Sequence, residues 1–315
     1  MTSKALNPQI IELLAELQQR EIPPIQNLTP TEAREIRNPI LTGFGGPKAE
    51  VAGVENRTIP GPDGPVPVRI YTPKGNGPFP ILLFFHGGGW VVGSLDTHDC
   101  ACRLLSSGAQ CLVVAVDYRL APENKFPAAI EDAYAALEWV SENGETLNGD
   151  PRNIAVAGDS AGGNIATILC QMSRDRQGPE IKYQILIYPV TDLSSTHTES
   201  YDKHGEGYML TKEGMIYFIN HYLDRDENKS HPYASPLLAE NLSNLPPALI
   251  IVAEFDVLRD ECLAYADRLK KAGIPVTCLL YDDMIHAFLN LSGVLDRTRE
   301  AIEDMCGKLQ KVFRS

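Results

Sequence analysis

A single serine stands inside a glycine cluster in the segment NIAVAGDSAGGNIATILC. Gly158 and Gly162 flank Ser160 in a G-x-S-x-G pattern, after an apolar run typical of a strand and before a pattern typical of a helix. On such a strained turn a serine hydroxyl can act as a nucleophile, and the helix start directs N–H groups at a nearby anion. The five residues alone are equally compatible with an ordinary turn whose serine caps the helix.

A serine nucleophile requires a base, because its hydroxyl is weakly nucleophilic until it can pass on its proton. His286 follows the last strand-like run, in YDDMIHAFL, where a loop can return it to the strand ends. We therefore predict His286 as the base, the alternative being a solvated loop histidine. The other histidines after Ser160, at positions 197, 204, 221 and 231, lie in a long insertion between two strand-like runs.

The acid of such a site is expected just beyond a strand, at the edge where open α/β sheets collect their ligands. Asp256 has this position in LIIVAEFDVLRDE, and spacing alone leaves Glu254 as an alternative. Asp260 is better explained as the N-terminal charge of the next helix, and Asp282 and Asp283 as solvated loop residues.

Three consecutive glycines, Gly87 to Gly89, follow the strand-like run ILLFF in FFHGGGWVVGS. Their N–H groups can approach a substrate oxygen without interference from side chains, so this loop and the N–H of Ala161 predict an oxyanion hole. A phosphate-binding loop is the alternative, but the segment lacks a lysine and the G-x-x-x-x-G-K-[ST] pattern.

The elements that must position these residues alternate along the chain. Apolar runs typical of strands lie at 66–71, 81–85, 112–116, 154–157, 185–188, 249–253 and 276–281. Helical patterns separate them from residue 81 onward, at about 98–109, 127–141, 161–173, 260–272 and 294–313. This alternation predicts an α/β fold whose sheet is mostly parallel and has helices on both faces. The first runs follow each other directly, so the sheet is expected to begin with antiparallel strands.

Two segments do not follow this alternation. Residues 1–45 have the pattern of one or two amphipathic helices with a proline-broken link, and residues 191–235 form an insertion longer than a crossover requires. We expect both to cover the site as a lid. The expected organisation is therefore cap helices at 1–45, a first part of the core at 46–190, a second cap segment at 191–235 and the rest of the core at 236–315.

Composition narrows the function classes. The sequence has 28 Lys and Arg against 41 Asp and Glu, a net charge of −13, which disfavours nucleic acid and anionic lipid as partners. The first residues lack the features of a secretory signal and the apolar runs are too short to span a bilayer, so we expect a cytoplasmic protein without a membrane anchor. The cluster His98, Asp99, Cys100 and Cys102 could suggest a metal site, but neighbours on a helix point in different directions, and we predict no metal.

Taken together, these segments resemble the hormone-sensitive-lipase-like branch of the α/β-hydrolase esterases, also called bacterial family IV. The matching pieces cover most of residues 65–290: HGGGWVVGSLDTHD, VDYRLAPENKFPAAIEDAY, VAGDSAGGNIA, LIYPVTD, LPPALIIVAEFDVLRDE and MIHAF. The resemblance implies an α/β-hydrolase fold with a helical cap and a carboxylesterase that acts on short to medium acyl esters. It further implies that no cofactor is needed and that the chain can form a homodimer.

The resemblance also implies residue roles. Ser160 would be the nucleophile, His286 the base and Asp256 the orienting acid, which decides against Glu254. Gly88, Gly89 and Ala161 would donate to the oxyanion. Trp90 and Tyr188 flank the inferred site and are expected either to line the substrate pocket or to pack in the core.

Four further motif residues, His86, Asp117, Arg119 and Glu123, are expected to hold the glycine loop and a neighbouring turn rather than to react. Two positions depart from the family pattern: Ala287 and Asp283 stand where glycine is usual. A carboxylate at Asp283 could raise the imidazole pKa of His286, which is a hypothesis for the pH dependence.

Two other readings of the function remain open on the sequence. An amidase or lactonase would use the same reacting groups, because the leaving-group pocket and not the triad distinguishes them. A ligand receptor built on this fold, like the plant gibberellin receptors, is disfavoured because those proteins have lost the histidine that stands here as His286.

Overall fold

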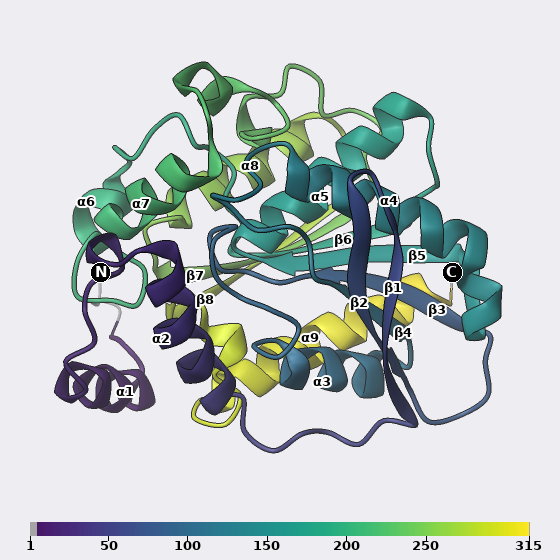
Figure 1. Cartoon of the computed structure of the whole chain (residues 1–315), viewed down its shortest axis with the longest axis horizontal. Helices are drawn as coiled ribbons and strands as arrows, with labels where there is room; N and C mark the ends of the chain where they lie inside the picture. Colours follow the sequence, from purple (N-terminus) through teal and green to yellow (C-terminus); the bar gives the residue numbers. More distant parts are fainter. Residues whose placement is uncertain (1–4, 315) are drawn as a thin grey trace.

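The computed structural model describes residues 5–314, so residues 1–4 of the expected cap and residue 315 of the expected core lie outside the described residues. Within this range the chain forms a sheet of order β1-β2-β4-β3-β5-β6-β7-β8 (Figure 1). Its strands are β1 (Gly53–Gly61), β2 (Gly64–Thr72), β3 (Phe79–Phe85), β4 (Leu112–Val116), β5 (Gly149–Asp159), β6 (Tyr183–Ile187), β7 (Ala248–Phe255) and β8 (Val276–Ile285). The β1–β2 and β2–β4 pairs are antiparallel and the remaining pairs are parallel. The predicted mostly parallel sheet that begins with antiparallel strands is confirmed.

Strand β1 was not among the predicted runs. Its sequence GVENRTIPG buries only Ile59, because β1 lies at the sheet edge and pairs with β2 alone. Edge strands bury little apolar surface and so carry a weak hydrophobic pattern.

The interior strand β3 is buried on both of its faces: Ile81 and Leu83 pack into the core on one face and Leu82 and Phe84 into the core on the other. Burial on both faces explains its uninterrupted apolar run.

Helices cover both faces of the sheet (Figure 1). One face carries α3 (Asp99–Ala109) and α9 (Asp296–Val312), and the other carries α4 (Ala128–Asn143), α5 (Ala161–Arg176) and α8 (Arg259–Lys271). Their ends differ from the predicted ends by at most three residues. No helix among residues 5–314 is long and apolar enough to cross a membrane.

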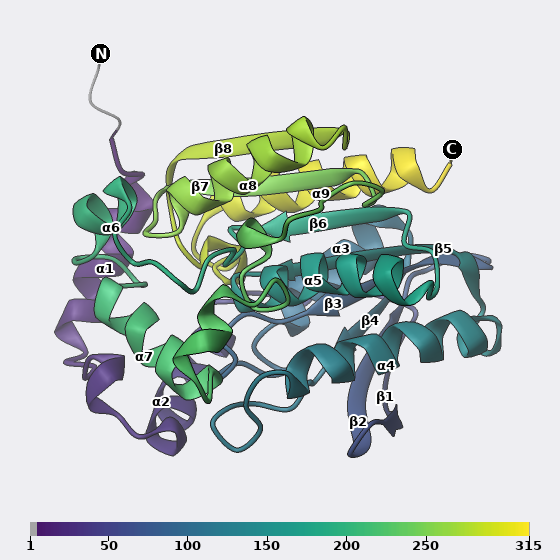
Figure 2. The same cartoon turned by 90° about the horizontal axis from the view of Figure 1, so that it is seen from above.

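Four further helices lie together beyond one end of the sheet, as Figures 1 and 2 show from two directions. They are α1 (Pro8–Gln19), α2 (Pro30–Gly43), α6 (Glu199–His204) and α7 (Lys212–Tyr222). The sequence sets the start of α2: Thr29 and Glu32 form a capping box and Pro30 occupies the first turn. Segments that are far apart in the chain thus meet at the end of the sheet where β3, β5, β7 and β8 finish.

Candidate active site

Three predicted residues meet although they follow three different strands. Ser160 comes directly after β5, Asp256 directly after β7 and His286 directly after β8. The Oγ of Ser160 lies 2.9 Å from Nε2 of His286, and Nδ1 of the same ring lies 2.7 Å from Oδ2 of Asp256. All three side chains are buried, with 2 to 7% of their surface exposed. This chain of hydrogen bonds can carry a proton from the hydroxyl to the imidazole while the carboxylate fixes the ring.

The backbone at Ser160 has the strained geometry expected of an elbow. Its φ of 55° lies in the left-handed region, and its N–H donates to the carbonyl of Ile187 at 2.8 Å. Helix α5 begins at the next residue and passes so close to β3 that a side chain at Gly162 would overlap the carbonyl of Phe85. The glycine is therefore required by the close approach of helix and strand.

The acidic residues near the site differ in their partners. Asp256 turns Oδ2 to His286 and accepts the N–H of Leu258 at 3.0 Å with Oδ1. Glu254 instead forms an ion pair with Arg259 at 2.9 Å. Spacing alone could not separate Asp256 from Glu254, and the structure brings Asp256 into hydrogen-bond contact with the imidazole.

The glycine loop presents donors to the same place. Gly88 and Gly89 have φ values of 120° and 58°, which side-chain-bearing residues rarely adopt. Within residues 5–314 their N–H groups donate to no protein acceptor. The N–H of Ala161 is in the first turn of α5, where helical N–H groups have no partner within the helix. These three predicted donors are thus available to a ligand.

The remaining motif residues hold this loop in place. Tyr118 donates its hydroxyl to the carbonyl of His86 at 2.6 Å. Arg34, from α2, donates to the carbonyl of Val91 at 2.7 Å and pairs with Glu123 at 2.6 Å. Burial, and then the neighbouring His98, lowers the pKa of His86 to about 4, so the His86 imidazole is neutral at pH 7.

Asp117 and Arg119 stabilise the neighbouring turn. Arg119 forms ion pairs with Asp132 at 2.9 Å and with Asp63 at 2.7 Å. Asp117 lies 3.8 Å from Nε2 of His86. The ion pairs of Arg119 fit the expected supporting role, whereas the distance from Asp117 to the neutral ring of His86 is too long for a hydrogen bond.

A cavity of about 910 Å³ opens over these groups. Its floor includes Gly87, Gly88, Gly89, Ser160 and His286, and its walls come mostly from α1, α2, α6, α7 and the segments that connect them. The apolar wall residues include Leu14, Leu17, Ile22, Ile25, Ile40, Leu41, Met209, Leu210, Met215 and Phe218. Sequence reasoning did not identify them, because an apolar residue on an amphipathic helix carries no signal that distinguishes a cavity wall from a packed core.

Trp90 and Tyr188 lie behind the cavity rather than in its wall. Trp90 is fully buried and stacks on Tyr222 of α7, with ring centroids 4.0 Å apart. Tyr188 is also fully buried; it packs against the ring of His286 at 4.7 Å and accepts the N–H of Leu289 at 3.2 Å. Of the two expectations for these residues, their burial favours core packing, and neither is among the residues that line the cavity.

The structure gives side-chain partners to Asp283 and to the cluster around His98. Asp283 pairs with Asn7 at 2.9 Å and with Arg297 at 3.1 Å, so its carboxylate is engaged there rather than with His286. Of the residues considered for a metal, His98 lies 2.9 Å from Asp159 and Asp99 forms an ion pair with Arg103. No group of three or more His, Cys, Asp or Glu side chains within residues 5–314 could hold a metal ion.

Comparison with known proteins finds α/β-hydrolases and ester hydrolases. A family model described as the alpha/beta hydrolase fold matches residues 82–290. The chain is 46% identical, over 283 residues, to the carboxylic ester hydrolase LipN of Mycobacterium tuberculosis, covering 87% of this chain and 75% of the relative. It is 39% identical to the ethyl acetate hydrolase of Pseudomonas putida, covering 78% of each.

Solved structures are similar over nearly the whole length. A hyperthermophilic esterase from the archaeon Pyrobaculum calidifontis superposes with a TM-score of 0.94 at 40% identity, covering 99% of this chain and all of the other. The similarity therefore includes the segments before residue 82 that the family model does not match.

Proposed function

This chain belongs to the α/β-hydrolase family, in its hormone-sensitive-lipase-like branch, and we propose that it is a serine carboxylesterase for short to medium acyl esters. One observation carries the proposal. The hydroxyl of Ser160, bonded to His286, shares a cavity floor with the unpaired N–H groups of Gly88 and Gly89. A nucleophile, a base and oxyanion donors at one point are the requirements of acyl transfer.

The proposed reaction proceeds in two halves. Ser160 Oγ attacks the ester carbonyl carbon while its proton passes to Nε2 of His286, and the negative oxygen is held by the N–H groups of Gly88, Gly89 and Ala161. The bond to the alcohol then breaks and Nε2 gives the proton to the leaving oxygen. Water attacks the acyl-enzyme by the reverse sequence, which releases the acid and restores the serine. Asp256 keeps the proton on Nδ1, so that Nε2 can accept.

The proposed substrate size rests on the cavity. Its volume of about 910 Å³ and its mainly aliphatic walls suit an uncharged acyl chain of moderate length. We further propose that residues 1–45 and 191–235 act as the cap that forms these walls, with 46–190 and 236–315 as the core. Amide and lactone substrates remain the alternative, because the same reacting groups would serve them.

Hydrolysis of p-nitrophenyl esters from acetate to palmitate tests this function. Wild-type protein is expected to be most active on short or medium chains, and Ser160→Ala is expected to lose this activity because it removes the hydroxyl that is bonded to His286. Equal rates in both proteins, or no hydrolysis in either, would count against Ser160 as an ester nucleophile and favour the amide, lactone or receptor alternatives.

A matched pair of variants tests the acid. Asp256→Asn is expected to lower kcat by roughly 10⁴-fold, because an amide at this position favours the wrong imidazole tautomer. Glu254→Gln, two residues away on the same strand end, is expected to change kcat by less than about 3-fold, since Glu254 pairs with Arg259. Steady-state kinetics on the best p-nitrophenyl ester measures both, and a larger loss in Glu254→Gln would reverse the assignment.

A further inference from the structure

We propose that a buried charged pair, His98 and Asp159, positions the oxyanion loop, with His98 held as an imidazolium. Asp159 directly precedes Ser160, and His98 directly precedes α3. Neither residue touches the reacting atoms in the mechanism above, so both are positioning residues. The inference rests on the proposed esterase function for its catalytic consequence, but the pair itself can be tested without any activity.

The carboxylate of Asp159 holds the glycine loop through a hydrogen bond. Its Oδ1 accepts the N–H of Gly87 at 2.8 Å and lies 2.9 Å from Nε2 of His98. The approach is close enough that a Cβ added to Gly87 would lie 2.5 Å from Oδ2. Because Gly87 is joined directly to Gly88 and Asp159 directly to Ser160, one carboxylate links the oxyanion donors to the nucleophile.

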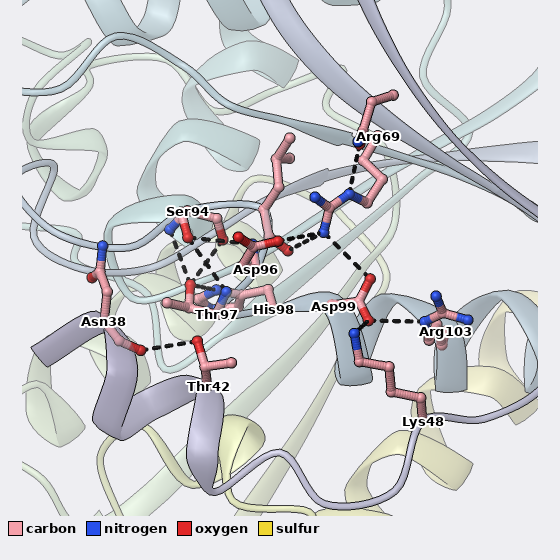
Figure 3. Close-up of polar contacts among 12 residues, drawn as sticks. Asn38, Thr42, Lys48, Arg69, Ser94, Asp96, Thr97, His98, Asp99 and Arg103 are labelled. Carbon is pink, nitrogen blue, oxygen red and sulfur yellow. Dashed lines mark hydrogen bonds and ion pairs between the residues drawn. The ribbon is translucent and has the colours of Figure 1, made fainter.

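The hydrogen bonds around His98 indicate its protonation state. Figure 3 shows the hydroxyl of Thr97 beside the ring, 2.8 Å from Nδ1. That hydroxyl donates its one proton to the carbonyl of Ser94 at 2.8 Å and accepts the N–H of Ser94 at 3.0 Å. We therefore assign Nδ1 as the donor to Thr97, and Nε2, 2.9 Å from Oδ1 of Asp159, as the donor to that carboxylate. With both nitrogens acting as donors, the ring carries a positive charge.

The surroundings support a charged pair. His98 and Asp159 are each 2% exposed, and a buried carboxylate is strongly disfavoured unless it is paired. Burial by itself would raise the pKa of Asp159, but the charge and hydrogen bond of His98, the Gly87 N–H and the more distant His286 together hold that pKa below its usual range.

Other groups that face His98 do not replace this pairing. The ring of His86 lies 5.7 Å away and is neutral. The N–H of Gly87 also points towards Nε2, but at 3.4 Å, against 2.8 Å to Asp159. Nδ2 of Asn290 lies 3.0 Å from Nε2 while its buried Oδ1 has no partner, so we assign this amide the reverse orientation, in which its oxygen accepts from Nε2. Asp99 is adjacent in sequence, but its carboxylate is bonded to Arg103, Lys48 and Arg69, as Figure 3 shows. Asp159 is therefore the carboxylate that matches the charge of His98.

Loss of this pair is expected to affect the stabilisation of the transition state but not the binding of the substrate. Loss of the pair would let Gly87 move and so displace the N–H groups of Gly88 and Gly89, which act on the negative oxygen of the transition state. Ground-state binding depends on the cap-lined cavity and would be kept. The expected signature is a fall in kcat with little change in KM.

Asp159→Asn tests the positioning role, with Asp99→Asn as the matched control from the same polar cluster. Asp159→Asn is expected to lower kcat by roughly 10²-fold, as for a displaced catalytic group, with KM changed by less than about 2-fold. Its affinity for a trifluoromethyl ketone, which forms an oxyanion adduct with the serine, should fall in parallel, whereas affinity for the matching methyl ketone should not. Asp99→Asn should keep kcat within about 2-fold. Equal kcat values in the two variants would overturn the proposal.

Two readouts do not depend on activity. Nitrogen NMR of histidine-labelled protein at pH 8 should show two protonated ring nitrogens for His98, assigned by their loss in His98→Gln; one unprotonated nitrogen would overturn the charged pair. Hydrogen exchange of the Gly87 amide should quicken in Asp159→Asn and not in Asp99→Asn, and unchanged exchange would overturn the anchoring. If wild-type protein hydrolyses no ester, the proposed function fails while these two results still decide the pair.

Discussion

Three histidines near the glycine loop have different tasks because their neighbours differ. His286 stands between a hydroxyl and a carboxylate, which suits proton transfer. His98 stands between Thr97 and Asp159, which suits a fixed charge. His86 is buried beside that charge and stacks on Tyr118 at 4.4 Å, which suits a neutral ring. The residue type alone distinguishes none of these roles.

The neutrality of His86 predicts a pH dependence of stability. Its pKa is about 4 in the folded protein and 6.5 when unperturbed, so between these values the unfolded chain binds a proton that the native protein does not. The neutral His86 therefore contributes fully to the free energy of unfolding above pH 6.5. This contribution is lost as the pH falls towards 4, by up to about 3 kcal/mol.

Urea unfolding at several pH values between 7 and 4 measures this effect in wild-type protein and in His86→Asn. The difference between their free energies of unfolding is expected to shrink as the pH falls through this window. A difference that stays constant from pH 7 to 4 would mean that His86 is not held neutral by the fold.

At the scale of elements, the cap helices are tied to the core by a few specific contacts. Asn7 caps α1 and bonds to Asp283 of β8 through both its backbone N–H, at 3.1 Å, and its side chain, at 2.9 Å. Arg34 of α2 is tied to Glu123 and to the glycine loop. Since α1 and α2 supply cavity walls, these ties place the walls over Ser160.

Asp283→Gly is therefore expected to loosen α1. Proteolysis within residues 5–21 should become faster, and KM for the longer esters should rise by a few fold, because Leu14 and Leu17 leave the cavity wall. The pH–rate profile should stay unchanged, since the carboxylate is bonded to Asn7 and Arg297. Asp282→Gly is the control, because the Asp282 side chain is 61% exposed. A shifted acid limb in Asp283→Gly alone would restore the hypothesis that Asp283 acts on His286.

At the scale of the whole molecule, the active site exists only where distant segments meet. Ser160 and His286 follow two strands of the sheet, and α1, α2, α6 and α7 supply most of the cavity walls. Figure 2 shows these four helices grouped at one end of the sheet. Phe218 of α7 packs so closely on Gly89 that a side chain there would overlap its ring. The cap therefore shapes the oxyanion loop as well as the acyl space.

A bulky side chain in the cap wall should change the preferred acyl length. Leu17→Trp, which narrows the cavity, is expected to lower kcat/KM for octanoate and longer p-nitrophenyl esters by about 10-fold or more and for acetate by much less. Ile11→Trp is the control, because Ile11 lies on the same helix but is 55% exposed and outside the cavity. Parallel losses for all chain lengths in Leu17→Trp would mean that this wall does not contact the acyl chain.

Local pattern by itself predicted most of the elements and the positions of the candidate reacting groups. The interior strands, the helices that cover the sheet, the elbow at Ser160 and the glycine loop were predicted, because buried strands, helix periodicity and tight turns each require particular residues at short spacing. Strand β1 was not predicted, because an edge strand needs no apolar run.

Tertiary structure decided everything that depends on which side chains meet across the chain. Spacing left Asp256 and Glu254 as alternatives and the family resemblance favoured Asp256; the approach of β8 to β7 brings Asp256 into contact with His286. Trp90 and Tyr188 were expected near the site, and packing placed them behind it. The pair of His98 and Asp159 and the walls of the cavity join residues tens to hundreds of positions apart, and such contacts are set by the fold as a whole rather than by local spacing.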